Sequence, residues 1–305
     1  MHYYNSMLDL IGHTPLVKIN YAFEQIEGVN LFAKLEYYNP SGSVKDRTGL
    51  YMVQDAIKDG RLKRGSTIVE ATAGNTGLGV AFAALNQGFH VIFVVPEKFS
   101  EEKQILMKAL GADIIHTKRE DGMLGAAAKA QELLSQIKDS ISLEQFKNMS
   151  NPKAHYETTG PEIYEDLDGR IDYLVAGAGS GGTYSGVVKY LKEQNRNIKG
   201  ILADPVGSTM GGGEHANYDI EGIGNDFIAD TMDMSLVEKV IKITDTQAFD
   251  GARALARHEG ILGGSSTGAA FSAALKLIYE HHVKGNIVFI APDRGDRYFS
   301  KHLYA

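Results

Sequence analysis

Several features that functional sites often use are missing from this chain of 305 residues. It contains no cysteine, which excludes disulfides, thiolate metal sites and cysteine nucleophiles. Its longest apolar runs, such as residues 91–96, have the length of a strand and are far too short to span a membrane. It has no basic tract, so we expect no binding to nucleic acid. Its 10 histidines show no ligand spacing, and we predict no metal site.

The composition is that of a globular protein. Hydrophobic residues make up 43% of the chain and charged residues 23%, with a net charge of −7. The length allows one large or two medium domains. The first nine residues lack the basic and apolar regions of a signal peptide, so we expect a cytoplasmic protein. The 34 glycines cluster, which indicates tight loops where the backbone approaches another group closely.

Short apolar runs alternate with longer amphipathic ones, which predicts an α/β fold with mostly parallel sheets and helices on both faces. A sequence change near residues 145–152, where a strand gives way to an Asn/Pro-rich loop, suggests a domain junction. Ligands in such folds lie at the carboxyl ends of the strands. The predicted strands are 31–35, 67–70, 91–95, 113–116, 173–176, 200–203, 240–243 and 286–290. The predicted helices are 47–59, 76–86, 101–110, 125–137, 183–193, 246–259 and 269–282.

Lys45 stands between a Pro/Gly/Ser turn and an amphipathic helix pattern. The dipole of a helix favours anions at its start, so a cation there is unusual. A lysine in this position is a candidate for a neutral, reactive amine. The alternative is an ordinary surface charge.

Three Gly-rich loops stand before helix patterns, and they begin at Ala71, Gly177 and Gly263. The second has the form of an anion cradle, because backbone N–H groups and the hydroxyls of Ser180 and Thr183 meet at a helix start. The same loop also reads as a dinucleotide fingerprint, with Gly177, Gly179 and Gly182 followed by Asp204. An NAD-binding oxidoreductase is therefore the alternative from another class of protein.

A phosphate cradle together with a reactive amine suggests pyridoxal 5'-phosphate, which needs a lysine, a phosphate anchor and a partner for its ring nitrogen. Ser265 or Ser266 is a candidate for that partner. Asn75 is a candidate for the ring hydroxyl. Capping of the following helix is the alternative role for Asn75 and Ser266.

Five ordered motifs, together with Leu10-Ile-Gly-His-Thr-Pro-Leu16, resemble the cysteine synthase/cystathionine β-synthase family along almost the whole chain. They are Asn39-Pro-Ser-Gly-Ser-Val-Lys-Asp-Arg47, Thr72-Ala-Gly-Asn-Thr-Gly77, Gly179-Ser-Gly-Gly-Thr183, Glu221-Gly-Ile-Gly224 and Gly264-Ser-Ser-Thr-Gly268. The resemblance implies fold type II of the pyridoxal-phosphate enzymes (tryptophan synthase β-like), with two three-layer α/β domains, the cofactor in the cleft and a homodimer. It places a smaller, mobile, substrate-gripping domain at 39–147, and a larger domain for the cofactor phosphate at 1–38 plus 148–305.

The resemblance also assigns residues. Lys45 is implied as the Schiff-base lysine and as the acid/base at the substrate Cα. Asn75 is implied at the ring hydroxyl and Ser266 at the ring nitrogen. The phosphate is implied to bind Gly179, Ser180, Gly181, Gly182 and Thr183. The substrate is implied to bind Thr72, Ala73, Gly74, Asn75, Thr76, Gln145, Gly222, Ile223 and Gly224.

The implied reaction is β-replacement or β-elimination on L-cysteine, O-acetyl-L-serine or L-serine through an aminoacrylate. A neutral serine cannot stabilise a protonated ring nitrogen as a carboxylate would, so the cofactor ring is a weaker electron sink, which favours this chemistry over transamination. Further alternatives are conversion of L-cysteine to lanthionine and a non-catalytic amino-acid-binding module.

Three departures from the family pattern stand out. Ala73 replaces the usual serine. Residues 221–228 and 292–293 look closer to cystathionine β-synthases, although we expect neither a regulatory C-terminal domain nor a haem module. Asp230 follows Ala229 where a proline and a small or neutral residue are usual. A carboxylate there is a candidate general base that activates water, which would make the reaction a conversion of L-cysteine to L-serine and hydrogen sulfide. A solvated loop aspartate is the alternative.

Overall fold

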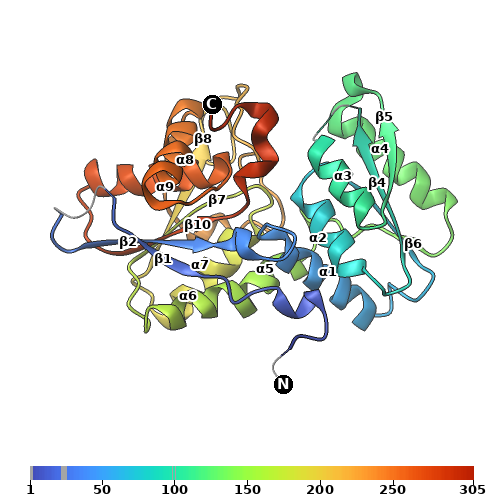
Figure 1. Ribbon diagram of the computed structural model, residues 1–305, viewed down its shortest axis with the longest axis horizontal. Helices are drawn as coiled ribbons and strands as arrows, with labels where there is room; N and C mark the ends of the chain where they lie inside the picture. The colour runs from blue at the N-terminus through green and yellow to red at the C-terminus, as the bar shows by residue number, and fades with distance from the viewer. Residues whose placement is uncertain (1–2, 22–25, 98, 100) are drawn as a thin grey trace. The chain divides into compact units, whose positions relative to one another are not determined.

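The computed structural model describes residues 3–21, 26–97, 99 and 101–305. The chain forms two compact units, and Figure 1 shows their elements. Unit 1 comprises Met1–Ile11 and Lys45–Asn151, and unit 2 comprises Gly12–Val44 and Pro152–Ala305. None of the described helices combines the length and the apolarity that are needed to cross a bilayer.

Unit 1 is a three-layer structure around a parallel sheet of order β5-β4-β3-β6. Successive side chains of a strand point to opposite faces. Val69 and Val94 therefore pack with α4, whereas Ile68 and Phe93 lie in the core with α1, α2 and α3. The elements are α1 (Lys45–Lys58), β3 (Thr67–Ala71), α2 (Asn75–Ala84), β4 (His90–Pro96), α3 (Glu101–Ala109), β5 (Asp113–Thr117), α4 (Gly122–Gln136) and β6 (Ser140–Ile141).

Unit 2 has a sheet of order β1-β2-β10-β7-β8-β9, in which β1 is antiparallel to β2 and the other pairs are parallel. Helices α8 and α9 cover one face, and α6 and α7 cover the other. The elements are β1 (Leu16–Ile19), β2 (Val29–Leu35), α5 (Ser150–Ala154), a π-helical turn (His155–Thr159), α6 (Gly160–Asp166), β7 (Tyr173–Gly177), α7 (Gly182–Gln194), β8 (Lys199–Pro205), β9 (Val237–Ile243), α8 (Asp245–Glu259), α9 (Ser265–Tyr279) and β10 (Gly285–Ala291).

The predicted α/β fold is confirmed, and each predicted strand and helix is present within a few residues. One expectation was wrong. The Asn/Pro-rich stretch does not remain a loop through Pro152 but becomes α5 there. Proline is tolerated in the first turn of a helix because the N–H that it lacks has no partner there. The sequence patterns also missed the short strands β1 and β6 and the helix α6.

Helices α1 and α2 cross at two glycines. A Cβ atom on Gly49 would lie 2.3 Å from the carbonyl carbon of Gly79. A Cβ atom on Gly79 would lie 2.2 Å from the carbonyl oxygen of Lys45. The backbone of Lys45 is therefore in direct contact with α2.

We predict that Gly79→Ala destabilises the protein by about 1–3 kcal/mol, because the added methyl group must push α1 and α2 apart. In a helix without this contact, the same change would stabilise by roughly 0.5–1 kcal/mol. The sign of the change therefore tests the packing, and it is measured as the shift in urea midpoint. Gln54→Ala, on the exposed side of α1, is the control and should leave the midpoint nearly unchanged. A higher midpoint for Gly79→Ala would contradict the close crossing.

Candidate active site

The helices that follow the three Gly-rich loops begin without a side-chain cap. The N-cap residues of α2, α7 and α9 are Gly74, Gly181 and Gly264, and none of these ends has a side-chain capping hydrogen bond. Asn75 is the first helical residue of α2, and Ser266 is the second of α9. Neither is a cap, so the capping alternative does not hold for them. The first N–H groups of a helix need acceptors from outside it, and anions supply these well.

Lys45 is the first residue of α1, which begins two residues before the predicted helix, and its side chain is partly exposed. The turn that precedes it is fixed within unit 2. The buried Asn39 accepts a hydrogen bond from the Gly12 N–H (2.8 Å) and donates to Glu36. Glu36 in turn accepts from the Thr14 hydroxyl at 2.6 Å. These contacts explain why the motif at 10–16 accompanies the motif around Lys45.

The structure brings Thr76 and Gln145 together in unit 1. The hydroxyl of Thr76 donates to Gln145 Oε1 at 2.6 Å, and the Gln145 carbonyl accepts from the Asn151 side chain at 2.9 Å. Thr72 and Thr76 are buried, whereas Gly74 and Asn75 are partly exposed. Ala73 belongs to the apolar core of unit 1. The α2 loop and Gln145 therefore form one hydrogen-bonded group.

Glu70, at the end of β3, holds the segment that carries Gln145, and sequence patterns did not single it out. Its Oε1 atom accepts from the Leu143 N–H, the Glu144 N–H (3.1 Å) and the Ser142 hydroxyl (3.0 Å). Burial raises the pKa of Glu70, and these three donors partly oppose the shift. An acid that ends a buried strand is the only signal that the sequence offers.

The phosphate-binding candidates continue directly from β7 into α7 in unit 2. Thr183, in the first turn of α7, lies 3.2 Å from Nε2 of His155, whose Nδ1 lies 2.9 Å from the Thr159 hydroxyl. His155 is fully buried in the π-helical turn. Gly186 lets that turn approach α7, because a Cβ atom there would lie 2.8 Å from the His155 Cβ. Sequence analysis missed His155, since only the folded chain shows its contact with Thr183.

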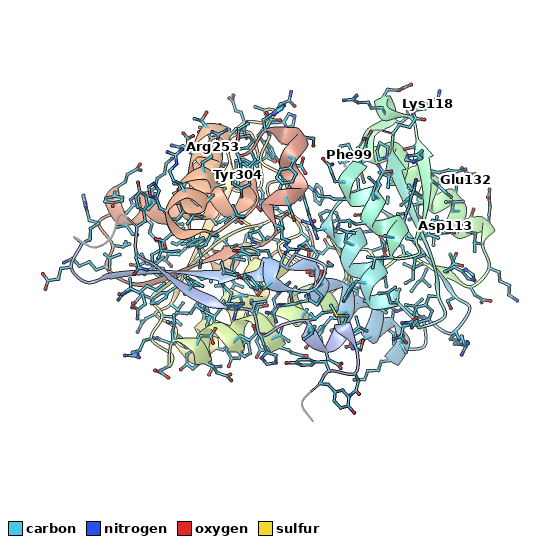
Figure 2. The ribbon with its side chains drawn as sticks, in the orientation of Figure 1. Phe99, Asp113, Lys118, Glu132, Arg253 and Tyr304 are labelled. Atoms are coloured by element: carbon cyan, nitrogen blue, oxygen red, sulfur yellow. The ribbon has the colours of Figure 1, made fainter. Side chains whose placement is uncertain are left out.

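The start of α9 is held by the C-terminal part of unit 2. The Gly264 N–H donates to the Asp293 carbonyl (3.0 Å), and the Tyr304 hydroxyl donates to the Gly263 carbonyl (2.5 Å). Figure 2 labels Tyr304 beside Arg253 of α8, which binds the last carbonyl of the chain at 3.1 Å. Ser266 is 3% exposed, and its hydroxyl makes no side-chain hydrogen bond with any residue that the structure describes.

The carboxylate of Asp204 is already paired with Lys242, which does not fit a role in binding a nucleotide. It is buried at the end of β8, and its Oδ2 atom pairs with Lys242 (2.5 Å) and accepts from the Gly211 N–H (3.1 Å). In the dinucleotide fingerprint this carboxylate would bind a ribose. The pairing with Lys242 therefore argues against the NAD alternative.

Gly222, Ile223 and Gly224 lie against the loop that follows β7. Both glycines have positive φ angles, 85° and 82°, which favour glycine. The Gly224 N–H donates to the Ala178 carbonyl (2.7 Å), and the Ile223 side chain packs over Gly177. Asp230 is exposed, between the buried Ala229 and Thr231.

The raised pKa of Glu70 predicts the effect of Glu70→Gln. Because the pKa of Glu70 is higher in the folded protein than in the unfolded chain, the neutral acid favours the folded state. This contribution to stability is fully present below the unfolded pKa of about 4.5, and it is lost as the pH rises through the folded pKa. The glutamine side chain does not ionise, so the variant does not lose stability in this way as the pH rises. The difference in free energy of unfolding, variant minus wild type, should therefore rise with pH above 4.5 and then level off. Urea unfolding between pH 4 and 8 measures it, and a difference that falls with pH would contradict the assignment.

Comparison with known proteins gives a consistent result. Residues 7–293 match the family model described as pyridoxal-phosphate dependent enzyme. The chain is 49% identical to the O-acetylserine dependent cystathionine beta-synthase of Bacillus subtilis (strain 168), over 97% of this chain and 96% of that protein. It is 44% identical to the cysteine synthase of Helicobacter pylori (strain J99), over 98% and 99%.

Among solved structures, a hydrogen sulfide-producing enzyme from Fusobacterium nucleatum is similar, with a TM-score of 0.91 and 40% identity. The match covers 97% of this chain and 100% of that structure. The architecture is fold type II, as the sequence motifs implied. With these matches and the motifs in order along both units, the chain belongs to the cysteine synthase/cystathionine β-synthase family of pyridoxal-phosphate dependent enzymes.

Proposed function

We propose that this enzyme catalyses β-replacement on a small β-substituted L-amino acid, with O-acetyl-L-serine, L-serine or L-cysteine as donor. The bond from Cβ to the leaving group breaks, and a bond from Cβ to an incoming sulfide or thiol forms. Acetate, water or sulfide leaves with the bonding electron pair. A proton is removed from Cα and later returned, so the substrate undergoes no net oxidation.

The residues of each unit fit pyridoxal phosphate. The uncapped start of α7 offers N–H groups to a phosphate, and α9 presents the buried Ser266 hydroxyl. Unit 1 presents the amine of Lys45 at the start of α1. When bound, the cofactor supplies an electron-withdrawing ring that acidifies the substrate Cα–H. In our proposal, Lys45 holds the cofactor covalently and then moves the Cα proton.

Ser266 is the observation that carries the choice of reaction. A serine hydroxyl is neutral and cannot stabilise a protonated ring nitrogen as a carboxylate does. The hydroxyl is available to the ring, since it has no side-chain partner among the described residues. A weaker electron sink favours loss of the β-substituent together with the Cα proton. This supports β-replacement over transamination.

The remaining assignments belong to the same proposal. Thr72, Ala73, Gly74, Asn75 and Thr76, with Gln145, form the loop that binds the substrate carboxylate, and the bond between Thr76 and Gln145 supports their joint action. Asn75 also serves the ring hydroxyl. Gly222, Ile223 and Gly224 line the substrate. We further propose a cytoplasmic homodimer, with the smaller domain as the mobile, substrate-gripping part.

Lys45→Ala tests the proposal. We expect the variant to lose the violet absorbance of lysine-bound cofactor, and product formation to fall by at least about 10²-fold, because both the attachment and the proton transfer are lost. Lys58→Ala, at the other end of α1, is the matched control and should keep both properties. Products are identified for each donor with and without a thiol. A Lys45→Ala enzyme with full turnover would refute the assignment.

A second candidate reaction uses water as the acceptor and converts L-cysteine and water to L-serine and hydrogen sulfide. The hydrogen sulfide-producing enzyme with a similar structure makes this candidate relevant. Asp230 is exposed to water, yet the hydroxyl of the next residue, Thr231, donates to the Ser180 carbonyl of the phosphate loop at 2.5 Å. The Asp230 carboxylate therefore projects from a segment that is anchored to that loop. We propose it as the general base for water.

Asp230→Asn should lower serine production from cysteine by about 10²-fold or more, because the amide cannot take a proton from water. Replacement with a thiolate nucleophile should persist, since a thiolate needs no base. Glu214→Gln, another exposed carboxylate of this unit, is the control. Equal serine production by Asp230→Asn and wild type would remove Asp230 from the mechanism and leave the first proposal intact.

A further inference from the structure

Residues 221–231, which we call the strut, bind three successive carbonyls of the loop that begins α7. The Gly224 N–H donates to the Ala178 carbonyl at 2.7 Å. The Asn225 side-chain amide donates to the Gly179 carbonyl at 2.6 Å, and the Thr231 hydroxyl donates to the Ser180 carbonyl at 2.5 Å. Two of the three donors are side chains, so the sequence of the strut determines them.

These bonds fix the direction of the loop amides. A peptide group is planar and trans, so its C=O and the following N–H point in opposite directions. When the carbonyls of 178, 179 and 180 point to the strut, the N–H groups of Gly179, Ser180 and Gly181 point away from it. Those N–H groups are the donors that an anion at the start of α7 needs.

Close packing keeps the loop flat on the strut. A Cβ atom on Gly179 would lie 2.6 Å from the Gly222 carbonyl oxygen, and one on Gly181 would lie 2.4 Å from the Cβ of Met232, the residue directly after the strut. There is no room for a side chain at these two positions. The glycines therefore permit the contact, while Asn225 and Thr231 give it direction.

The strut is itself anchored at its first residue, Glu221, and at Asn225. The Ser265 hydroxyl, in the first turn of α9, accepts from the Glu221 N–H at 3.0 Å. The Asn225 N–H donates to the Ser208 hydroxyl at 3.0 Å, and the Asn225 carbonyl accepts from the N–H groups of Thr209 and Met210. The Lys242 amine, which pairs with Asp204, binds the Ser208 carbonyl at 2.7 Å. The strut thus connects the starts of α7 and α9.

We propose that Asn225 and Thr231 are positioning residues for the cofactor phosphate, which act by aiming the amides of residues 179–181. The inference rests on the proposed placement of the phosphate at this loop. In this proposal, Asn225 and Thr231 act through the loop and do not act on the reacting atoms. Their loss should therefore weaken cofactor binding and change the phosphate environment more than it changes the chemical step.

Thr231→Val is the central test, because it removes the hydroxyl and keeps the shape of the side chain. We expect the apoenzyme to bind pyridoxal phosphate about tenfold more weakly, which corresponds to one hydrogen bond to an ordered loop. The ³¹P resonance of the bound phosphate should shift toward that of the free cofactor. Thr231→Ser should restore the affinity to within about twofold of wild type and return the ³¹P resonance to its wild-type position. Asn225→Asp, which replaces the donor by an acceptor, should weaken binding at least as much.

Ser272→Ala is the matched control, since the Ser272 hydroxyl also donates to a backbone carbonyl (Gln247, 2.7 Å) but lies outside the strut. Unchanged affinity and ³¹P shift in Thr231→Val would overturn the inference, as would an equal loss in Ser272→Ala. Thr183→Val separates this failure from that of the proposed site. If Thr183→Val also binds the cofactor normally, the phosphate does not lie at this loop, and the placement itself is wrong.

Discussion

The first amide groups of three helices control much of this structure. Every helix leaves its initial N–H groups without partners inside the helix. At α2, α7 and α9 the N-cap is glycine, which has no side chain to cap them. Three such ends are a cost to the folded protein unless a ligand meets them. Three features leave these N–H groups accessible. They are the Gly-rich loops, the close packing behind them and the small polar residues in the first turns.

Close backbone contact is the second requirement, and both units meet it in the same way. In unit 1, Gly49 and Gly79 bring α1 and α2 together at the carbonyl of Lys45. In unit 2, a Cβ atom on Gly268 would lie 1.8 Å from the Ala248 carbonyl oxygen, so α8 and α9 also meet through their backbones. In each case the contact fixes a helix start that carries a candidate residue, Lys45 or Ser266. Backbone is stiffer than side chain, which makes glycine contacts suitable for positioning.

The sequence predicted the features that depend on a repeating pattern or on a local motif. Apolar alternation located the strands, and the motifs around Lys45 and in the loops identified the family. The sequence did not predict the roles that depend on contacts formed only in the folded chain. Glu70, His155, Asn225 and Thr231 act on segments that are distant in sequence, and no local pattern predicts these contacts. The alternative role of Asn75 and Ser266 as helix caps does not hold, because Gly74 and Gly264 occupy the cap positions of α2 and α9.

The strut shows how one segment can serve two needs that would otherwise conflict. Its inward residues are fixed, since Ala229 and Thr231 are buried and Asn225 donates to the Gly179 carbonyl of the loop before α7. Its outward residues are exposed, with Phe227 at 51%, Ile228 at 55% and Asp230 between two buried neighbours. Under the proposed function, changes at the outward positions would alter the charge and shape that the strut offers to a nucleophile, and they would remove none of its hydrogen bonds to the loop before α7. If the proposed function holds, the choice of acceptor can therefore change while the hydrogen bonds that direct the amides of residues 179–181 stay constant.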